Sequence, residues 1–184
     1  MQTDWKPRLI ELIKQHALLL GEFTLRSGKK STYYIDGRMI TLHPEGALLI
    51  ARGILDSIAG QRVDAVGGPE MGAVPIVGAV CAVSHQMSTP VRGFVFRKEV
   101  KEHGTKKLIE GPIQPGDRVV VVEDTTTTAG QVVKCIRACK EIGCEVVKVV
   151  PVIDREDEGR ANVEAEGCAF APLTTIADFG LRNT

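Results

Sequence analysis

Two adjacent carboxylates begin the part of the chain best suited to chemistry. Glu123 and Asp124 follow the apolar run Val119–Val122, and after them comes a turn of hydroxyl-bearing and small residues: Thr125, Thr126, Thr127, Thr128, Ala129 and Gly130. Free N–H groups, hydroxyls and the dipole of a following helix would bind a phosphate. The carboxylates would accept hydrogen bonds from vicinal sugar hydroxyls. The pattern favours a ribose 5-phosphate site, but it also suits a strand end that merely caps the next helix.

A second candidate is the basic stretch 97–111. It contains glycines, no apolar periodicity, and the cationic or titratable residues Arg97, Lys98, Lys101, His103, Lys106 and Lys107. This composition predicts a long mobile loop, and loops of such length inside compact domains usually have a function. The loop would either close over an anion and neutralise its charge or remain a solvated basic surface without a role.

Both stretches must be positioned by the elements around them. Short β-branched runs near residues 63–66, 91–96, 118–123 and 146–153 alternate with helical patterns near 72–85 and 130–142. This alternation predicts an α/β fold with a doubly wound, mostly parallel sheet covered on both faces. Because Val119–Val122 shows no polar alternation, we expect a central strand there. The acidic pair then lies at the carboxyl edge of the sheet, where such folds bind ligands.

The first part of the chain has a different pattern. Apolar residues at helical spacing predict a helix over 4–20: Trp5, Leu9, Leu12, Ile13 and Leu20. Two β-like runs, 22–25 and 31–36, flank a turn-rich segment and predict a hairpin. Pro44 starts another helix that we expect to reach about Gly60, with Leu48 and Leu49 facing inward. We therefore divide the chain into a small unit, 1–43, and an α/β core, 44–184, that includes the loop 97–111. The acidic segment 154–167 predicts a solvated loop or short helix.

Composition restricts the partners. Lys and Arg total 23 against 23 Asp and Glu, so the net charge is zero. Such a chain has no overall field to attract nucleic acid or an anionic membrane. No apolar run approaches the roughly 20 residues that span a bilayer. The segment from Met1 to Pro7 lacks the features of a secretory signal. We therefore expect a cytoplasmic protein with no nucleic-acid or membrane partner.

The five cysteines are interpreted as reduced thiols. Cys135 and Cys139 share one helical face, but no Cys-x-x-Cys pair or adjacent histidine completes a metal site. We expect them to pack as small apolar side chains, and we assign no residue of the chain as a metal ligand.

The motifs together resemble the orotate phosphoribosyltransferases, a family of type I phosphoribosyltransferases. The valine strand, acidic pair and threonine turn are similar to that family's motif for 5-phosphoribosyl 1-pyrophosphate (PRPP). Three further stretches match the family: 23–31 (FTLRSGKKS), 96–104 (FRKEVKEHG) and Asp154-Arg155. Their order and the chain length match as well, so the resemblance covers nearly the whole chain.

This resemblance implies transfer of the phosphoribosyl group from PRPP to N1 of orotate, assisted by Mg²⁺, within pyrimidine nucleotide synthesis. It implies that Glu123 and Asp124 hold the ribose hydroxyls and that Thr125 to Gly130 hold the 5′-phosphate. The catalytic loop residues would be Arg97, Lys98, Lys101 and His103, which would also contact PRPP. The family further implies a homodimer in which the loop 97–111 of one subunit completes the site of the other.

For orotate, the resemblance implies a hood formed by the N-terminal hairpin. The residues that would contact orotate are Arg26, Tyr33, Tyr34, Thr127 and Arg155. Three positions depart from the family pattern: Arg26 and Met71 replace lysines, and Ala129 replaces a glycine. At Ala129 we expect a turn that is shifted or that accepts alanine at negative φ.

Two other functions compete with this interpretation. A phosphoribosyltransferase acting on a purine base would share the core, but the stretch 23–31 argues against it. A regulator that binds PRPP without turnover, with RNA or DNA as its partner, is disfavoured by the zero net charge, and also by the basic loop, because a sensor needs no closing catalytic loop.

Overall fold

The valine-rich strand lies at the centre of the sheet, as predicted. Strand β6 (Arg118–Thr126) has β3 (Ala65–Pro69) on one side and β7 (Glu145–Asp154) on the other, and both pairings are parallel. All four valines, Val119–Val122, are completely buried. The computed structural model describes residues 4–24, 30–98 and 107–182 of the 184-residue chain.

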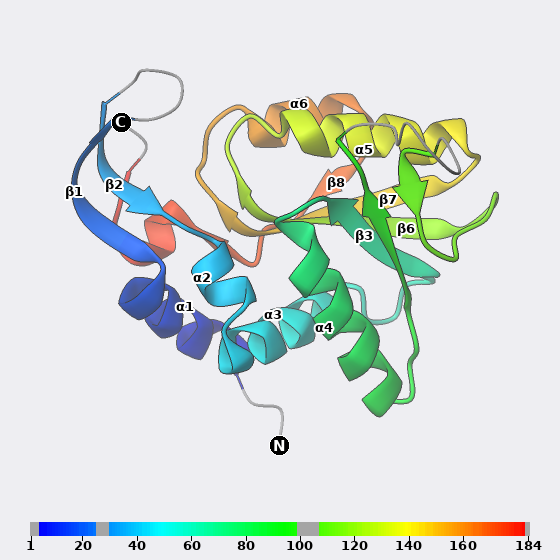
Figure 1. Cartoon of the computed structure of the whole chain (residues 1–184), viewed down its shortest axis with the longest axis horizontal. Helices are drawn as coiled ribbons and strands as arrows, with labels where there is room; N and C mark the ends of the chain where they lie inside the picture. The colour runs from blue at the N-terminus through cyan, green and yellow to red at the C-terminus, as the bar shows by residue number, and fades with distance from the viewer. Residues whose placement is uncertain (1–3, 25–29, 99–106, 183–184) are drawn as a thin grey trace.

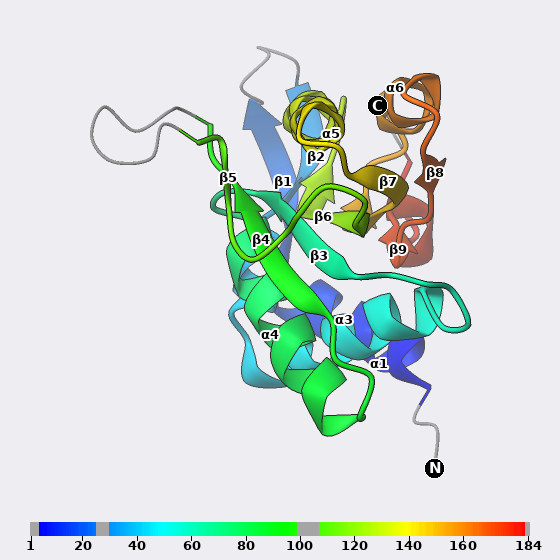
Figure 2. The ribbon, with the colours of Figure 1, turned by 90° about the vertical axis from the view of Figure 1, so that its right-hand side faces the viewer.

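The remaining strands extend this sheet on both sides (Figure 2). Their order is β5-β4-β3-β6-β7-β8, and β9 also pairs with β7. The outer strands are β4 (Arg92–Phe96), β5 (Ile109–Glu110), β8 (Ala169–Phe170) and β9 (Thr174–Thr175). Every pairing in this sheet is parallel except that of β5 with β4. The prediction of a mostly parallel sheet is confirmed.

Helices cover both faces of the sheet (Figure 1). On one face lie α1 (Trp5–His16), α3 (Pro44–Ser57) and α4 (Ala73–Gln86), and on the other lie α5 (Gly130–Glu141) and α6 (Gly159–Ala165). Val120 and Val122 belong to the apolar cluster of the first face, whereas Val119 and Val121 belong to that of the second. This alternation explains why the strand has no polar residue, because both of its faces are buried. None of the described helices is long and apolar enough to cross a bilayer.

The N-terminal hairpin forms a separate two-stranded sheet. Strand β1 (Leu18–Thr24) pairs antiparallel with β2 (Lys30–Ile35), to one side of the main sheet in Figure 1. Helix α1 is shorter than expected, because Leu20 lies in β1 with 72% of its surface exposed and is not an inward helical residue. Leu9 and Ile54, from either side of residue 43, share one apolar cluster. The division at residue 43 stays a prediction.

Several other expectations need adjustment. Helix α3 ends at Ser57, and Leu48 is 37% exposed, so it does not face inward. Two short elements were not predicted from the sequence: helix α2 (Arg38–Thr41) and the 3₁₀ turn Ile176–Phe179. The expected loop 97–111 is shorter at its far end, because Ile109 and Glu110 pair with β4. The acidic segment 154–167 contains the short helix α6, one of its two predicted forms.

The buried cysteines pack as apolar residues, as expected. Cys135 and Cys139 lie on the inner side of α5 and are fully buried in the second apolar cluster. The pKa of the Cys135 thiol is raised well above its ordinary value, first by its contact with Cys139 and then by burial. All five cysteines are free thiols.

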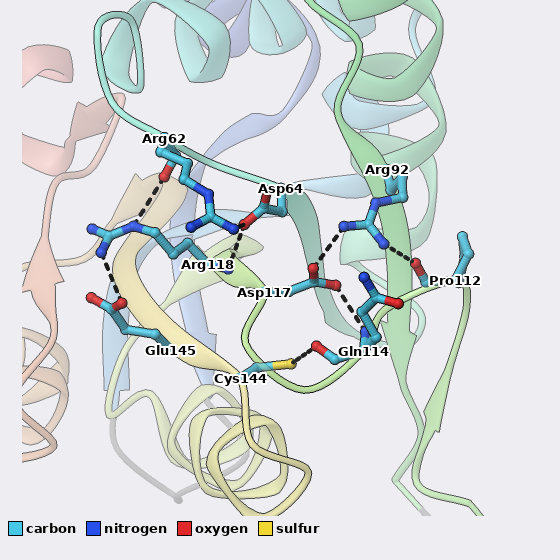
Figure 3. Close-up of polar contacts among 9 residues, drawn as sticks. All are labelled: Arg62, Asp64, Arg92, Pro112, Gln114, Asp117, Arg118, Cys144 and Glu145. Carbon is cyan, nitrogen blue, oxygen red and sulfur yellow. Dashed lines mark hydrogen bonds and ion pairs between the residues drawn. The ribbon is translucent and has the colours of Figure 1, made fainter.

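Charged residues close the amino edge of the sheet (Figure 3). The guanidinium of Arg92 donates to the Asp117 carboxylate at 2.8 Å and to the carbonyl of Pro112 at 2.7 Å. Asp117 also accepts the backbone N–H of Gln114. Arg118 pairs with Glu145 at 2.8 Å. These pairs join the beginnings of β4, β6 and β7, so hydrogen bonds and ion pairs within the protein stabilise this edge.

Candidate active site

The carboxyl end of β6 opens into a pocket of about 360 Å³. The strand supplies the acidic residue Glu123 and the hydroxyls of Thr125 and Thr126, and the loop to α5 supplies the rest of the rim. Residues that complete the lining are Thr127, Thr128, Ala129, Gly130, Gln131, Val132 and Lys134. The predicted acidic pair and threonine turn therefore lie together at the predicted edge of the sheet.

The acidic pair is held by its own backbone and by two glycines. The N–H of Asp124 donates to Glu123 Oε1 at 3.1 Å, and the N–H of Thr125 donates to Asp124 Oδ1 at 2.7 Å. Gly37 and Gly72 immediately precede α2 and α4. A Cβ at Gly37 would lie 2.7 Å from Thr125 Oγ1, and one at Gly72 would lie 2.6 Å from Asp124 Oδ1. Both positions therefore require glycine, and α4 begins next to negative side chains, the favourable sense of its dipole.

Electrostatics distinguish Glu123 from an ordinary surface glutamate. Burial raises the pKa of Glu123 well above its usual value, the adjacent Asp124 carboxylate raises it further, and the charge of Lys98 opposes the rise. The pair therefore resists carrying two negative charges while the pocket is without a ligand. Hydrogen-bond donors, such as the hydroxyls of a sugar, would favour the charged form.

The threonine turn presents unsatisfied polar groups to the pocket. Within the described part of the chain, the buried Oγ1 atoms of Thr125 and Thr126 have no hydrogen-bond partner. Ala129, the residue before α5, makes no side-chain cap, and the first turn of α5 contains no acidic residue. Buried hydroxyls and the first N–H groups of a helix both need partners, and an anion bound here would supply them.

Ala129 departs from the expected conformation. Its φ is 60° and its ψ is 21°, so it lies in the left-handed region, and the expectation of a negative φ is wrong. This region costs an alanine about 1–2 kcal/mol and costs glycine much less. The turn has thus kept a glycine-type conformation with an alanine in it.

Helix α6 supports the turn from outside. The side-chain amide of Asn162 donates to the carbonyl of Thr128 at 2.9 Å. Gly159 lies so close that an added Cβ would be 2.6 Å from Thr126 Cγ2 and 2.6 Å from the carbonyl oxygen of Thr127. Asn162 had escaped notice because it lies far along the chain in an acidic segment; only the folded structure shows this contact.

Two of the residues expected to contact orotate are neighbours. The guanidinium of Arg155 lies 5.1 Å from the centre of the Tyr33 ring, and the N–H of Arg155 donates to the Thr126 carbonyl at 2.9 Å. Arg155 therefore connects the hairpin to the threonine turn. Within the described residues, the buried Tyr33 hydroxyl and Arg155 Nε lack hydrogen-bond partners. Tyr34 lies on the opposite, exposed face of β2, where its ring is 5.7 Å from that of Phe23.

The beginning of the basic loop is tied to the same edge. The N–H of Lys98 donates to Glu70 Oε1 at 3.1 Å, and the N–H of Arg97 donates to the Leu108 carbonyl at 2.8 Å. Lys98 is near enough to Glu123 to affect its pKa. Met71, which follows Glu70, is 74% exposed. The other expected contacts, Arg26, Lys101 and His103, lie outside the described residues.

Three lining residues were not predicted from the sequence: Gln131, Val132 and Lys134. They belong to α5 and carry no motif, but a lysine four positions after the first helical residue is a usable signal for a cation above a helix end. For a metal, the described residues contain no group of three or more His, Cys, Asp or Glu side chains that could hold one. The adjacent carboxylates supply only hard oxygen donors, so they fit a Mg²⁺ whose other ligands are substrate oxygens and water.

Comparison with known proteins identifies the family of this chain. Residues 39–165 match the phosphoribosyl transferase domain family. An orotate phosphoribosyltransferase from Rhodopirellula baltica is 43% identical over 179 residues, covering 94% of this chain and 93% of its own. The chain belongs to the orotate phosphoribosyltransferase family. This is a family of transferases, and its members share the α/β fold seen here.

Solved structures of family members support the assignment. The crystal structure of the Mycobacterium tuberculosis orotate phosphoribosyltransferase with Fe(III) dicitrate has a TM-score of 0.86 and 37% identity, covering 96% of this chain and 99% of that one. The same enzyme in complex with PRPP has a TM-score of 0.81 and 35% identity, with the same coverage.

Proposed function

We propose that this protein is an enzyme of pyrimidine nucleotide synthesis that transfers the 5-phosphoribosyl group of PRPP to N1 of orotate. The products are orotidine 5′-monophosphate and pyrophosphate. The observation that carries the proposal is the pocket at the end of β6, where an acidic pair adjoins unpartnered threonine hydroxyls and an uncapped helix. Membership of the family supports it, as does the PRPP complex of the M. tuberculosis relative.

The donor is placed by the two halves of this pocket. Glu123 and Asp124 accept hydrogen bonds from the ribose 2′- and 3′-hydroxyls. The segment from Thr125 to Gly130 binds the 5′-phosphate through its hydroxyls and through the free N–H groups at the start of α5. Supporting this placement, Glu123 and the phosphate turn line the same pocket, and Asp124 is adjacent to both in β6.

The acceptor is placed between the hairpin and the core. Arg155 pairs with an orotate carbonyl or carboxylate, and Tyr33 packs beside the pyrimidine, with Thr127, Tyr34 and Arg26 completing the contacts. The proximity of the Arg155 guanidinium to the Tyr33 ring supports this location. The hairpin β1–β2 acts as the hood over the base, as part of an N-terminal unit, 1–43, against the core, 44–184.

The chemistry requires stabilisation of charge more than a nucleophilic side chain. The bond from C1′ to the pyrophosphate oxygen breaks with its electron pair, and the ribose passes through an oxocarbenium-like state. The bond from C1′ to N1 of orotate forms as N1 loses its proton, which the departing pyrophosphate accepts. Arg97, Lys98, Lys101 and His103 neutralise the negative charge that develops on pyrophosphate, and the loop excludes water. Glu123 and Asp124 would help to hold Mg²⁺ together with substrate oxygens and water, and the ion would supply further charge neutralisation.

The assembly and location complete the proposal. The protein acts in the cytoplasm as a homodimer in which the loop 97–111 of each subunit completes the site of the other, with no nucleic-acid or membrane partner. The family resemblance supports this arrangement, and the zero net charge supports the absence of polyanionic partners.

One assay tests the proposal. The protein is mixed with PRPP, Mg²⁺ and orotate, and the loss of orotate absorbance is followed, with adenine, guanine, hypoxanthine and uracil as parallel acceptors. We expect consumption of orotate alone. Consumption of a purine would show that the hairpin does not select orotate. Binding of PRPP without consumption of any base would identify a regulator instead.

A further inference from the structure

Among the residues that line the pocket, two are ionisable. Glu123 lies at the sugar end, and Lys134 lies in the second turn of α5. A phosphate ester bound over the threonine turn would bring negative charge to a pocket that already holds a carboxyl group. Lys134 is therefore the lining residue able to offset that charge.

The geometry of a helix directs Lys134 toward the phosphate turn. It follows Gly130, the first residue of α5, by four positions, so the two residues share one face. Side chains on a helix tilt toward its amino end, and a long side chain covers the turn before its own Cα. The Lys134 ammonium can thus lie above the free N–H groups at the start of α5.

Lys134 differs from the other cations of its helix. Arg137 and Lys140 both pair with Glu166, at 2.7 and 3.7 Å. Within residues 4–24, 30–98 and 107–182, no hydrogen bond or ion pair involves the exposed Lys134 side chain. Its charge is therefore available to a ligand.

Lys134 is also placed where the helix itself does not favour it. A cation near the amino end of a helix opposes the dipole, and α5 has neither an acidic residue in its first turn nor a side-chain cap to compensate. The nearby Thr126 is 2% exposed, lines the pocket and leaves its hydroxyl without a partner in the described structure. An anion would satisfy the dipole, the hydroxyl and the ammonium together.

We propose that Lys134 binds the 5′-phosphate of the donor and makes the pocket select phosphorylated over unphosphorylated pentoses. This inference rests on the proposed function, because it uses the same phosphate turn. It adds a specificity-determining cation that lies outside the motif itself. An ammonium–phosphate contact at an exposed site contributes little binding free energy, so we expect the loss of Lys134 to weaken the affinity only moderately.

Calorimetric titration with ribose 5-phosphate and with ribose tests this role. For Lys134→Gln we expect about twofold to fivefold weaker binding of ribose 5-phosphate. Raising the salt concentration should weaken that binding less in Lys134→Gln than in the parent, because the variant has lost a charge that salt screens. Lys134→Arg keeps the charge and should stay within about twofold of the parent. Lys140→Gln removes the same charge about 9 Å further along the helix and should bind as the parent does.

Three results would overturn the inference: a Lys134→Gln protein that binds ribose 5-phosphate as the parent does, an equal loss in Lys140→Gln, or a parent protein with no preference for ribose 5-phosphate over ribose. The thermal midpoint of Lys134→Gln, measured without ligand, should not fall, because an unfavourable charge is removed from the helix start.

The transfer assay separates the two proposals. In Lys134→Gln we expect a higher KM for PRPP with kcat nearly unchanged, since the contact is made in the ground state as well. If Lys134 governs phosphate binding but no base is consumed by the parent, the proposed reaction fails and this inference stands. If orotate is consumed and Lys134→Gln binds ribose 5-phosphate normally, the inference fails and the reaction stands.

Discussion

Both edges of the central sheet carry acidic and other polar residues, but these groups have hydrogen-bond partners at the amino edge, whereas buried hydroxyls at the carboxyl edge lack them within the described residues. At the amino edge, Asp117 is 3% exposed, and both its oxygens accept hydrogen bonds, from Arg92 and from the N–H of Gln114. At the carboxyl edge, Glu123 has a raised pKa, and the hydroxyls of Thr125 and Thr126 have no partner within the described residues. The first edge is satisfied by the protein itself, and the second is left for a ligand to satisfy.

This difference separates stability from function along a single strand. A buried polar group that has its partners stabilises the fold, whereas one without partners costs free energy until something binds. Strand β6 begins in the first environment and ends in the second. Substitutions at its two ends should therefore change different measured quantities.

The largest expected effect is at the acidic pair. Asp124→Asn should weaken PRPP binding by about 10- to 100-fold, because a hydrogen bond to a charged group becomes a neutral one. The free energy of unfolding should not fall, since a repulsive neighbour of Glu123 is lost. Calorimetric titration and urea denaturation measure the two quantities. Unaltered PRPP affinity would show that the ribose contact is misplaced.

The opposite edge should respond in the opposite way. Asp117→Ala should lower the free energy of unfolding by about 2–3 kcal/mol, because Arg92 and the Gln114 N–H lose a buried partner. The kcat and KM for PRPP, measured well below the melting temperature, should match those of the parent. Arg62→Gln is the matched control, because its pair with Asp64 is exposed on the arginine side and should cost less than about 0.5 kcal/mol. A loss of activity in Asp117→Ala at full folding would contradict the separation of the two edges.

The pH dependence of stability tests the state of Glu123. Because its folded-state pKa is raised, the folded protein holds a proton that the unfolded chain releases, so this group stabilises the fold at low pH. That contribution is lost as the pH rises from the ordinary glutamate value through the folded-state pKa. Glu123→Gln should therefore be more stable than the parent at neutral pH and lose this advantage in acid. If the free energies of unfolding of Glu123→Gln and the parent differed by the same amount at every pH, a raised pKa of Glu123 would be contradicted.

A smaller effect is expected where α6 supports the turn. Asn162→Ala removes the amide that donates to the Thr128 carbonyl and should raise the KM for PRPP about threefold to tenfold, with a lesser change in kcat. Asn162→Leu also lacks the donor, keeps a similar volume and should behave alike. If Asn162→Leu kept the parent KM while Asn162→Ala did not, side-chain volume and not hydrogen bonding would be responsible.

The smallest effect concerns the conformation of Ala129. Ala129→Gly should raise the free energy of unfolding by about 0.5–1 kcal/mol, because relief of the left-handed strain exceeds the entropy cost of a glycine. The melting temperature should rise by about 1–4 °C, which differential scanning calorimetry measures. A lower melting temperature would mean that the turn relaxes around alanine at no cost.

Much of the architecture followed from local patterns. The run Val119–Val122 predicted a buried central strand because no polar residue interrupts it, and the position of Glu123 and Asp124 followed from where that strand ends. The hairpin was predicted, but its first strand was placed too late. Leu18 to Leu20 are apolar enough to continue a helix, but Leu19 and Leu20 are exposed in β1, so spacing alone did not decide their structure.

The rest of the site depends on contacts between distant segments. Gly37 and Gly72 adjoin Asp124 only because α2 and α4 both begin at the carboxyl edge, and Asn162 reaches Thr128 from another helix. No local periodicity encodes such contacts. The left-handed Ala129 was missed for another reason: alanine rarely adopts that conformation, so the sequence argued against it.

The two glycines beside the acidic pair limit how this chain can vary. Positions 37 and 72 need not touch a ligand, and their constraint comes from the space that the carboxylates occupy. At these positions the size of a new side chain decides whether a substitution is tolerated, and its polarity is immaterial. A methyl group there would push on Asp124 itself, so residues that perform no chemistry still govern the position of one that does.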